Sequence, residues 1–251
     1  MSEYDQNRRF MQCFLFKEAM AKSDQSKGVA APPFGKQVEG EPITLPPFAG
    51  ALPVAAYADL LDKRRSKRSY EETPMTQEQL SFMLWSTQGI QAIRGEVGTL
   101  RVAPSGGARH PFETYVAVKA VEGLASGIYY YAPAENIGEK RCTIKRVADL
   151  PSAEKISEML ANQKWAANAP VILFYSCVPY KSEWRYVENS HRVMLIDLGH
   201  VGQNAMLSAA ALGFGSCCMA AYNQGACDEV LGLDGLNEYT VYAVSVGKPR
   251  D

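Results

Sequence analysis

The chain has 251 residues, of which 47% are hydrophobic and 21% are charged, and its net charge is -1. This composition allows a sizeable core in one large domain or two small ones, and it disfavours a general nucleic-acid binder. We find neither an apolar run long enough to span a bilayer nor the basic-then-apolar start of a secretory signal. The expectation is therefore a cytoplasmic protein that binds no membrane.

The six cysteines and three histidines indicate neither a disulfide framework nor a metal site. Four cysteines are scattered along the chain, and Cys217 and Cys218 are neighbours that rarely pair with each other. The chain has no C-x-x-C motif, and no histidine stands at metal-ligand spacing from a cysteine. We expect reduced thiols and no bound metal.

Residues 1–53 are predicted to form an N-terminal helix followed by an extended arm. Residues 5–21 carry apolar side chains at helical spacing. Six of the 14 prolines lie within residues 31–53, a density that disfavours regular structure. Because the arm also carries apolar side chains, it is expected to pack on a folded surface, that of its own chain or that of another subunit.

The remaining residues, 54–251, are predicted to form one α+β domain. We expect helices at residues 55–63, 76–88, after Pro151, at 190–212 and near 227–231, and strands at residues 113–119, 127–131, 171–177, 216–221 and 239–246. Thr76-Gln77-Glu78-Gln79 has the pattern of a capping box, and Gly213 ends the long helix. Irregular mixing of strands and helices favours α+β over a doubly wound parallel sheet.

The sequence Arg64-Arg65-Ser66-Lys67-Arg68 places four of the 26 basic residues in five consecutive positions. Guanidinium, ammonium and hydroxyl groups are the donors that a phosphate accepts. A specific phosphate site is one interpretation. A solvated helix end and a nucleic-acid patch are the alternatives.

Two glycine-containing segments are further candidates for ligand contact. Pro104-Ser105-Gly106-Gly107-Ala108-Arg109-His110-Pro111 predicts a rigid loop whose backbone can approach a ligand, or simply a tight connection into the next strand. Residues 213–221 begin like a dinucleotide fingerprint, but Cys218 replaces the third glycine and the segment follows a helix. A Rossmann nicotinamide site is therefore disfavoured, although the small Ala220 and Ala221 would admit a flat ligand.

The long helix places Asp197, His200 and Asn204 on one face by their i, i+3, i+7 spacing. Buried polar groups need partners, so hydrogen bonding within the core explains these residues without any catalytic role. Cys217 and Cys218 are likewise interpreted as small buried hydrophobes rather than as nucleophiles.

In chain order, these motifs resemble the FMN-dependent nitroreductase superfamily over about residues 60–251. The basic cluster resembles its R-R-S-x-R signature, residues 127–131 its G-x-Y-x-Y strand, residues 197–213 its central helix and residues 246–250 its closing segment. The loop at residues 104–111 resembles P-S-x-G-A-R-x-P of a branch that includes the azoline dehydrogenases, which oxidise thiazolines and oxazolines in peptides.

This resemblance implies an α+β fold with an antiparallel sheet, in an intertwined homodimer with two FMN molecules at the subunit interface. The implied cofactor-binding residues are Arg64, Arg65 and Ser66 at the phosphate and ribityl end, Lys248 and Arg250 closing the phosphate site, Arg68 at the pyrimidine edge, the loop residues Pro104, Ser105, Gly106, Gly107 and Arg109 from the other subunit, and the Ala220 and Ala221 N–H groups near N5.

The resemblance also implies hydride transfer from NADH or NADPH through FMN to a small acceptor, such as a nitroaromatic, a quinone or an unidentified metabolite, by a ping-pong mechanism. Azoline dehydrogenases carry a Lys-Tyr pair, linked to proton removal, before the long helix. Here Trp184-Arg185-Tyr186 offers an arginine, which is a poor general base, and leaves Tyr186 as a candidate catalytic side chain. The alternatives are an azoline dehydrogenase acting on modified peptides and a non-enzymatic flavin-binding protein.

Overall fold

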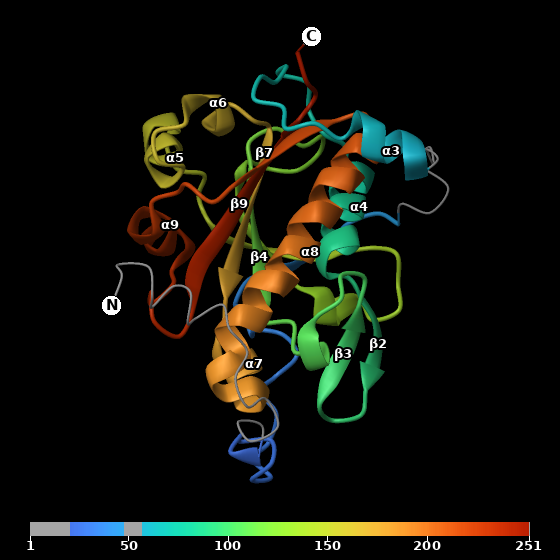
Figure 1. The fold of residues 1–251 in the computed structure, drawn as a ribbon. Coiled ribbons are helices and arrows are strands. Elements are labelled where there is room, and N and C mark those ends of the chain that lie inside the picture. Colours follow the sequence, from blue (N-terminus) through green and yellow to red (C-terminus); the bar gives the residue numbers. More distant parts are fainter. Residues whose placement is uncertain (1–20, 48–56, 251) are drawn as a thin grey trace.

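A seven-stranded sheet forms the centre of the computed structural model, which describes residues 21–47 and 57–250 (Figure 1). Its strand order is β1-β6-β5-β4-β7-β9-β8, and every neighbouring pair is antiparallel. The strands are β1 (Pro42–Thr44), β4 (Phe112–Val118), β5 (Gly127–Tyr131), β6 (Thr143–Ala148), β7 (Val171–Cys177), β8 (Gly215–Met219) and β9 (Tyr239–Gly247). A separate hairpin pairs β2 (Ile90–Arg94) with β3 (Gly98–Arg101).

Helices cover both faces of this sheet. The α-helices are α3 (Tyr57–Lys63), α4 (Gln77–Gln88), α5 (Ala153–Met159), α6 (Lys164–Ala167), α7 (Tyr180–Tyr186), α8 (Ser190–Ala211) and α9 (Gln224–Leu231). Short 3₁₀ helices are η1 (Gly106–Ala108), η2 (Pro133–Asn136) and η3 (Val187–Asn189). Residues of α4 and α8 join one core cluster, and those of α5, α6 and α9 join the other. None of the helices in the described ranges is both long and apolar enough to cross a bilayer.

The strands at the centre of the sheet are buried on both faces, which explains their unbroken apolar runs. In β5, Tyr129 and Tyr131 point into the α4–α8 cluster, whereas Ile128 and Tyr130 point into the other. Successive side chains of a strand alternate between faces, so a sheet covered on both sides needs apolar residues at every position. The predicted α+β class with an antiparallel sheet is confirmed.

Local signals in the sequence set several element boundaries. Thr76 Oγ1 accepts a hydrogen bond from the Gln79 backbone N–H at 3.3 Å, and the Gln79 side chain accepts one from the Thr76 N–H at 2.9 Å. This is the predicted capping box. Gly213, at φ +74°, follows the end of α8 in a conformation that suits glycine.

The predicted strands at residues 127–131 and 171–177 match β5 and β7. The strand predicted at residues 216–221 corresponds to β8, which ends two residues earlier, at Met219. The hairpin β2–β3, strand β6 and helix α7 were not predicted. Most of the helix predicted at residues 5–21 lies outside the described residues.

The proline-rich arm packs on the core of its own chain, and it contains a strand that its prolines had argued against. β1 pairs with β6, with Ile43 opposite Ile144. A proline is tolerated there because β1 is an edge strand and Pro42 is its first residue. Leu45 is fully buried, and Arg101 donates to the Phe34 carbonyl oxygen at 2.7 Å.

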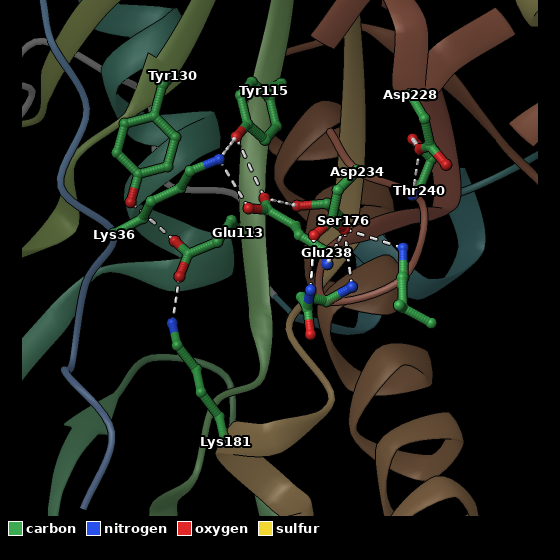
Figure 2. A network of polar contacts seen from close by, with 12 residues as sticks. Lys36, Glu113, Tyr115, Tyr130, Ser176, Lys181, Asp228, Asp234, Glu238 and Thr240 are labelled. Atoms are coloured by element: carbon green, nitrogen blue, oxygen red, sulfur yellow. Dashed lines mark hydrogen bonds and ion pairs between the residues drawn. The ribbon is translucent and has the colours of Figure 1, made fainter. Parts of the chain in front are cut away.

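A network of polar side chains holds the arm against the sheet (Figure 2). Lys36 reaches from the arm to Glu238, with its Nζ 2.7 Å from Oε2, and donates to the Tyr115 hydroxyl at 2.8 Å. Ser176 also donates to Glu238, at 2.7 Å. The Glu238 carboxylate before β9 therefore links the arm to β4 and β7.

Beside it lies a second buried ion pair, between Lys181 of α7 and Glu113 of β4. Tyr130 donates to the same carboxylate at 2.8 Å. Burial, and then the negative charge of Glu113, raise the pKa of Tyr130 well above its usual value. This pair fixes the start of α7 against the sheet.

The five cysteines of the described residues are free thiols. Burial raises the pKa of Cys142, Cys177 and Cys227 to about 12 and that of Cys218 to about 11. Thiols with such high pKa values make poor nucleophiles, which agrees with the interpretation of Cys218 as a small hydrophobe.

Candidate functional site

The predicted basic cluster lies along the free edge of β8. Ser66 forms a parallel bridge with Ser216, and the Lys67 N–H donates to the Ser216 carbonyl oxygen at 3.0 Å. The approach requires a glycine in the strand, because a methyl group added to Gly215 would lie only 2.7 Å from Lys67 Cβ. The start of β8 thus holds the basic cluster in place by its backbone.

The C-terminal segment returns to the same place. Glu71 N–H donates to the Lys248 carbonyl oxygen at 2.8 Å, and the Arg250 N–H donates to that of Ser69 at 3.1 Å. Two of the segments that the sequence singled out, about 180 residues apart, are therefore adjacent in space. Lys248 also forms an exposed ion pair with Glu71 at 3.6 Å.

A cavity of about 200 Å³ opens beside this junction, and four cations line it. Its lining residues are Lys63, Arg64, Arg65, Lys67, Met206, Ala210, Gly213, Phe214, Gly215, Ser216 and Pro249. No carboxylate lines it, and within residues 21–47 and 57–250 none of its four cations forms an ion pair. Charge gathered in this way without compensation favours binding of an anion.

Arg68 and Arg250 line a neighbouring cavity of about 500 Å³ instead. Arg68 Cζ lies 5.7 Å from the centroid of the Trp165 ring, and Lys119 and Asn168 are also in the wall. The structure therefore groups Arg250 with Arg68, whereas the sequence grouped it with Arg64.

The glycine loop at residues 104–107 is tied to α8 by one carboxylate. Ser105 Oγ donates to Asp197 Oδ2 at 2.6 Å, and the Gly106 N–H donates to the Asp197 carboxylate at 3.0 and 3.1 Å. Burial raises the pKa of Asp197 from its usual value, although these hydrogen bonds act against the shift. Asp197 is thus a positioning residue for the loop.

The other two polar residues predicted on that helix face, His200 and Asn204, have different surroundings. Asn204 donates to the Ser86 carbonyl oxygen at 2.9 Å and so joins α8 to α4, as hydrogen bonding within the core predicts. His200 is exposed. The predicted hydrogen bonding within the fold is therefore found for Asp197 and Asn204, but the exposed His200 is not buried with them.

Helices α7 and α8 press against the glycine loop, and together they explain its two glycines: Val193 of α8 crowds Gly106, and Tyr186 and Arg185 of α7 crowd Gly107. A methyl group on Gly106 would lie 2.4 Å from Val193 Cγ1, and one on Gly107 would lie 2.5 Å from the Tyr186 hydroxyl and 2.6 Å from Arg185 Nε. Gly107 also has a φ of +59°. The candidate Tyr186 is therefore a direct neighbour of the loop, on an element that the sequence did not predict.

Arg109 and His110 follow the loop into the interior. Arg109 is only 7% exposed, and its Cζ lies 4.8 Å from the centroid of the Trp184 ring. His110 Nε2 is 2.9 Å from the Thr99 carbonyl oxygen. Burial, and then the nearby charge of Arg101, lower the pKa of His110 to about 3, so the ring is neutral.

Within one chain, the loop and the basic cluster are too far apart to share a ligand. Asp197 and Ala210 mark the two places on α8, and 13 residues of α-helix span about 20 Å. Ala220 and Ala221 are exposed beyond the end of β8, about 13 Å along the strand from Ser216. In the described part of one chain, neither of the two cavities at the basic cluster is lined by the glycine loop or by Ala220 and Ala221.

Three comparisons with known proteins agree on one family. A model described as the nitroreductase family matches residues 61–248. MJ1384 of Methanocaldococcus jannaschii, named as a nitroreductase, is 31% identical over 190 residues, covering 76% of this chain and 89% of that protein. The trifolitoxin-processing protein TfxB of Rhizobium leguminosarum bv. trifolii is 31% identical over 150 residues, covering 58% of this chain.

Solved structures show the same fold. A chain from Anabaena variabilis ATCC 29413, described as a nitroreductase, has a TM-score of 0.66 at 22% identity over 86% of this chain. A chain of the Escherichia coli microcin synthetase McbBCD complex, with truncated pro-MccB17 bound, has a TM-score of 0.57 at 16% identity and covers all of this chain.

The present chain spans 44% of the length of the A. variabilis chain and 39% of that of TfxB. The family model, in contrast, covers the basic cluster, the glycine loop, α8 and β8 together. The resemblance seen in the sequence is thereby confirmed, and the chain belongs to the nitroreductase family.

Proposed function

We propose that this protein is an FMN-dependent oxidoreductase that passes hydride from NADH or NADPH to a small organic acceptor. The observation that carries the proposal is the cavity at residues 63–67, where four cations meet without a carboxylate in a chain of the nitroreductase family. A bound flavin would supply the hydride chemistry, which asks little of protein acid–base groups.

The donor set of the cavity fits a phosphate monoester. Arg64 and Arg65 in its wall would offer guanidinium N–H groups and Ser216 a hydroxyl, and charge-assisted hydrogen bonds of this kind are among the stronger ones in proteins. Ser66 does not line the cavity, but it bridges to Ser216 and would offer a further hydroxyl beside it. Lys248 precedes Pro249 of the cavity wall, and on leaving its exposed ion pair with Glu71 its ammonium group would add a further positive charge. Mutual repulsion of these cations would be relieved by a dianion.

The neighbouring residues suit the remainder of a flavin. Arg68 would supply positive charge near the pyrimidine edge, and its contact with Trp165 supports that side chain. Ala220 and Ala221 are exposed and carry no bulky side chain, so they leave room for a flat ring to approach their backbone, whose N–H groups would donate to it. Arg250 would act from the same side as Arg68.

A homodimer would bring the glycine loop of one chain to the basic cluster of the other. Figure 1 shows α3 next to one end of α8 and the β2–β3 hairpin toward its other end. All three elements carry exposed apolar side chains: Leu195 and Ile196 on α8, Leu61 on α3, and Ile93 and Leu100 on the hairpin. Clusters of exposed apolar residues favour protein–protein contact. We propose that this face is the subunit interface.

Reduction of the bound flavin tests the proposal. Purified protein would be loaded with FMN and mixed anaerobically with NADH or NADPH, followed by a nitroaromatic or a quinone. The proposal expects the flavin absorbance to bleach and then to return as the acceptor is reduced. Bound FMN that neither nucleotide can bleach would instead indicate a non-enzymatic flavin-binding protein.

A second candidate is an azoline dehydrogenase that acts on modified peptides. It is favoured by the match to TfxB, a toxin-processing protein, and by the position of Tyr186 against the glycine loop. Arg185 argues against it, because a guanidinium is a poor base. An azoline-containing peptide assayed with the wild type and with Tyr186→Phe decides between them: flavin-dependent aromatisation that requires Tyr186 would establish the peptide reaction.

The setting of the protein follows the same proposal. Free thiols in the described part of the chain fit a reducing compartment, and we propose the cytoplasm. Its partners would then be a small-molecule acceptor, the nicotinamide reductant and a second copy of the chain.

A further inference from the structure

Two arginines meet beside the glycine loop without an acidic partner. Arg109 leaves the loop and stacks on Trp184, while Arg185, the next residue of α7, lies against Gly107. Across residues 21–47 and 57–250, neither guanidinium forms an ion pair with a carboxylate. The proposed hydride transfer through FMN does not by itself supply an anion for these two arginines.

Arg109 is a buried cation with little compensation. Among the described residues, its hydrogen bond to the Ala108 carbonyl oxygen is long, at 3.4 Å, and its buried Nε has no partner. Burial, and then the charge of Arg185, lower the pKa of Arg109. A buried charge without a counter-charge is costly, and an anion would reduce that cost.

Arg185 is the accessible member of the pair. It is half-buried, donates to Gln25 Oε1 and packs on Tyr186, with its Cζ 5.5 Å from the ring centroid. Its Nε is also buried and unpartnered within the described part of the chain. Contacts of Trp184 with Gln25 and Val29 hold α7 from the other side, so the guanidinium has a fixed place.

We propose that Arg185, with Arg109 behind it, binds the carboxylate of an organic substrate beside the glycine loop. The inference rests on the proposed function and its homodimer, because it assigns a substrate class to the pocket that the glycine loop of one chain and the basic cluster of the other would form. A guanidinium matches a carboxylate through two parallel N–H donors. The cavity of residues 63–67 already has the donors for a phosphate, so the two guanidinium groups, as distinct from the loop backbone, are assigned to the substrate and not to the cofactor.

The position of this pair suits selection of the substrate. Gly107 has no side chain to cover Arg185, whose Nε would lie 2.6 Å from an added methyl group, and Asp197 holds the backbone of the neighbouring Gly106 in place. An acceptor with a carboxylate would be oriented by Arg185, whereas its neutral analogue would leave the two cations uncompensated. The site therefore discriminates by charge.

Direct binding of a non-reducible pair of probes tests the inference. Benzoate and benzamide would be titrated calorimetrically into FMN-loaded wild type, Arg185→Gln, Arg185→Lys and a matched control, Lys140→Gln, which removes an exposed charge elsewhere. We expect the wild type and the control to bind benzoate at least tenfold more tightly than benzamide. Arg185→Gln should lose this preference, and Arg185→Lys should keep part of it.

Turnover provides an independent readout with 4-nitrobenzoate and 4-nitrobenzamide. The ratio of their kcat/KM values should fall at least tenfold in Arg185→Gln, through KM. Equal affinity for benzoate and benzamide in the wild type, or an unchanged preference in Arg185→Gln, would overturn the inference. If Arg185→Gln changed only the monomer–dimer equilibrium, that result would also overturn the inference, because Arg109 and Arg185 would then serve a subunit contact. A preference for benzoate without any turnover would leave the carboxylate site standing while the proposed function fails.

Discussion

The neutral, buried His110 gives the protein a calculable loss of stability in acid. Its ring is 5% exposed, its Nε2 lies 2.9 Å from the Thr99 carbonyl oxygen, and its pKa is lowered to about 3 by burial and by the charges of Arg101, Arg109 and Lys181. In the unfolded chain the same group titrates near 6.5. Below that pH the unfolded state binds a proton that the folded state rejects.

The size of the effect follows from linkage. Each pH unit between the unfolded and the folded pKa values reduces the free energy of unfolding by about 1.4 kcal/mol per group. At pH 5, about 1.5 units below the unfolded pKa, His110 therefore lowers the free energy of unfolding by about 2 kcal/mol relative to pH 7.5. This figure holds for any folded pKa below about 4.

The variant His110→Gln removes the titration and keeps the local geometry. A glutamine amide can place an N–H group where His110 Nε2 lies and can donate to the Thr99 carbonyl oxygen. Urea unfolding, followed by circular dichroism at pH 7.5 and 5.0 and one protein concentration, measures the change in stability for each variant. The wild type should lose about 2 kcal/mol more than His110→Gln between the two pH values.

The control is His200→Gln, which changes an exposed histidine. It should lose as much stability in acid as the wild type. If His110→Gln shows the same acid loss as the wild type, then His110 is protonated in the folded state, and the buried, neutral ring described above is wrong.

Three further predictions concern the basic cluster, the arm and the loop. Gly215→Ala should weaken FMN binding at least tenfold, because its methyl group would lie 2.7 Å from Lys67 Cβ and displace the cluster; equilibrium dialysis measures this. Lys36→Met should lower the free energy of unfolding by roughly 1–3 kcal/mol in urea, because Glu238 loses its cation in a partly buried place. Asp197→Asn should speed amide hydrogen exchange in the glycine loop about tenfold, because an amide offers a single acceptor oxygen to two donors.

Each of these has a control or an outcome that contradicts it. Gly225→Ala, in α9 where an added methyl group has ordinary contacts, should leave FMN binding unchanged. Lys27→Met breaks an exposed pair with Asp24 and should change stability by less than about 1 kcal/mol. Exchange in β4 should not respond to Asp197→Asn. Equal effects of Lys36→Met and Lys27→Met, or unchanged exchange in the loop, would contradict the roles assigned here.

Much of the fold could be predicted because the decisive signals are local. The capping box at Thr76, the glycine after α8 and the unbroken apolar runs of β5 and β7 each depend on neighbouring residues. The arm shows the reverse. Pro42 argued against a strand, and only its place at the sheet edge, a tertiary fact, makes β1 possible.

The candidate site was predictable in its parts but not in its connections. Sequence reasoning found the basic cluster and the glycine loop, and it gave Asp197 a general role in core hydrogen bonding. It could not name the partners of Asp197, because they lie 91 and 92 residues away. The pairing of Arg109 with Arg185 was hidden for the same reason, since α7 had not been predicted. A carboxylate in an otherwise apolar helix was the signal that could have pointed to the loop.

The most direct test of the central claim is the binding of FMN to the basic cluster. We predict that the wild type binds one FMN per chain, that Arg64→Gln binds it at least tenfold more weakly through loss of a charge-assisted contact, and that Lys140→Gln binds it as the wild type does. A wild-type protein that binds no FMN, or an Arg64→Gln variant that binds it equally well, would contradict the account.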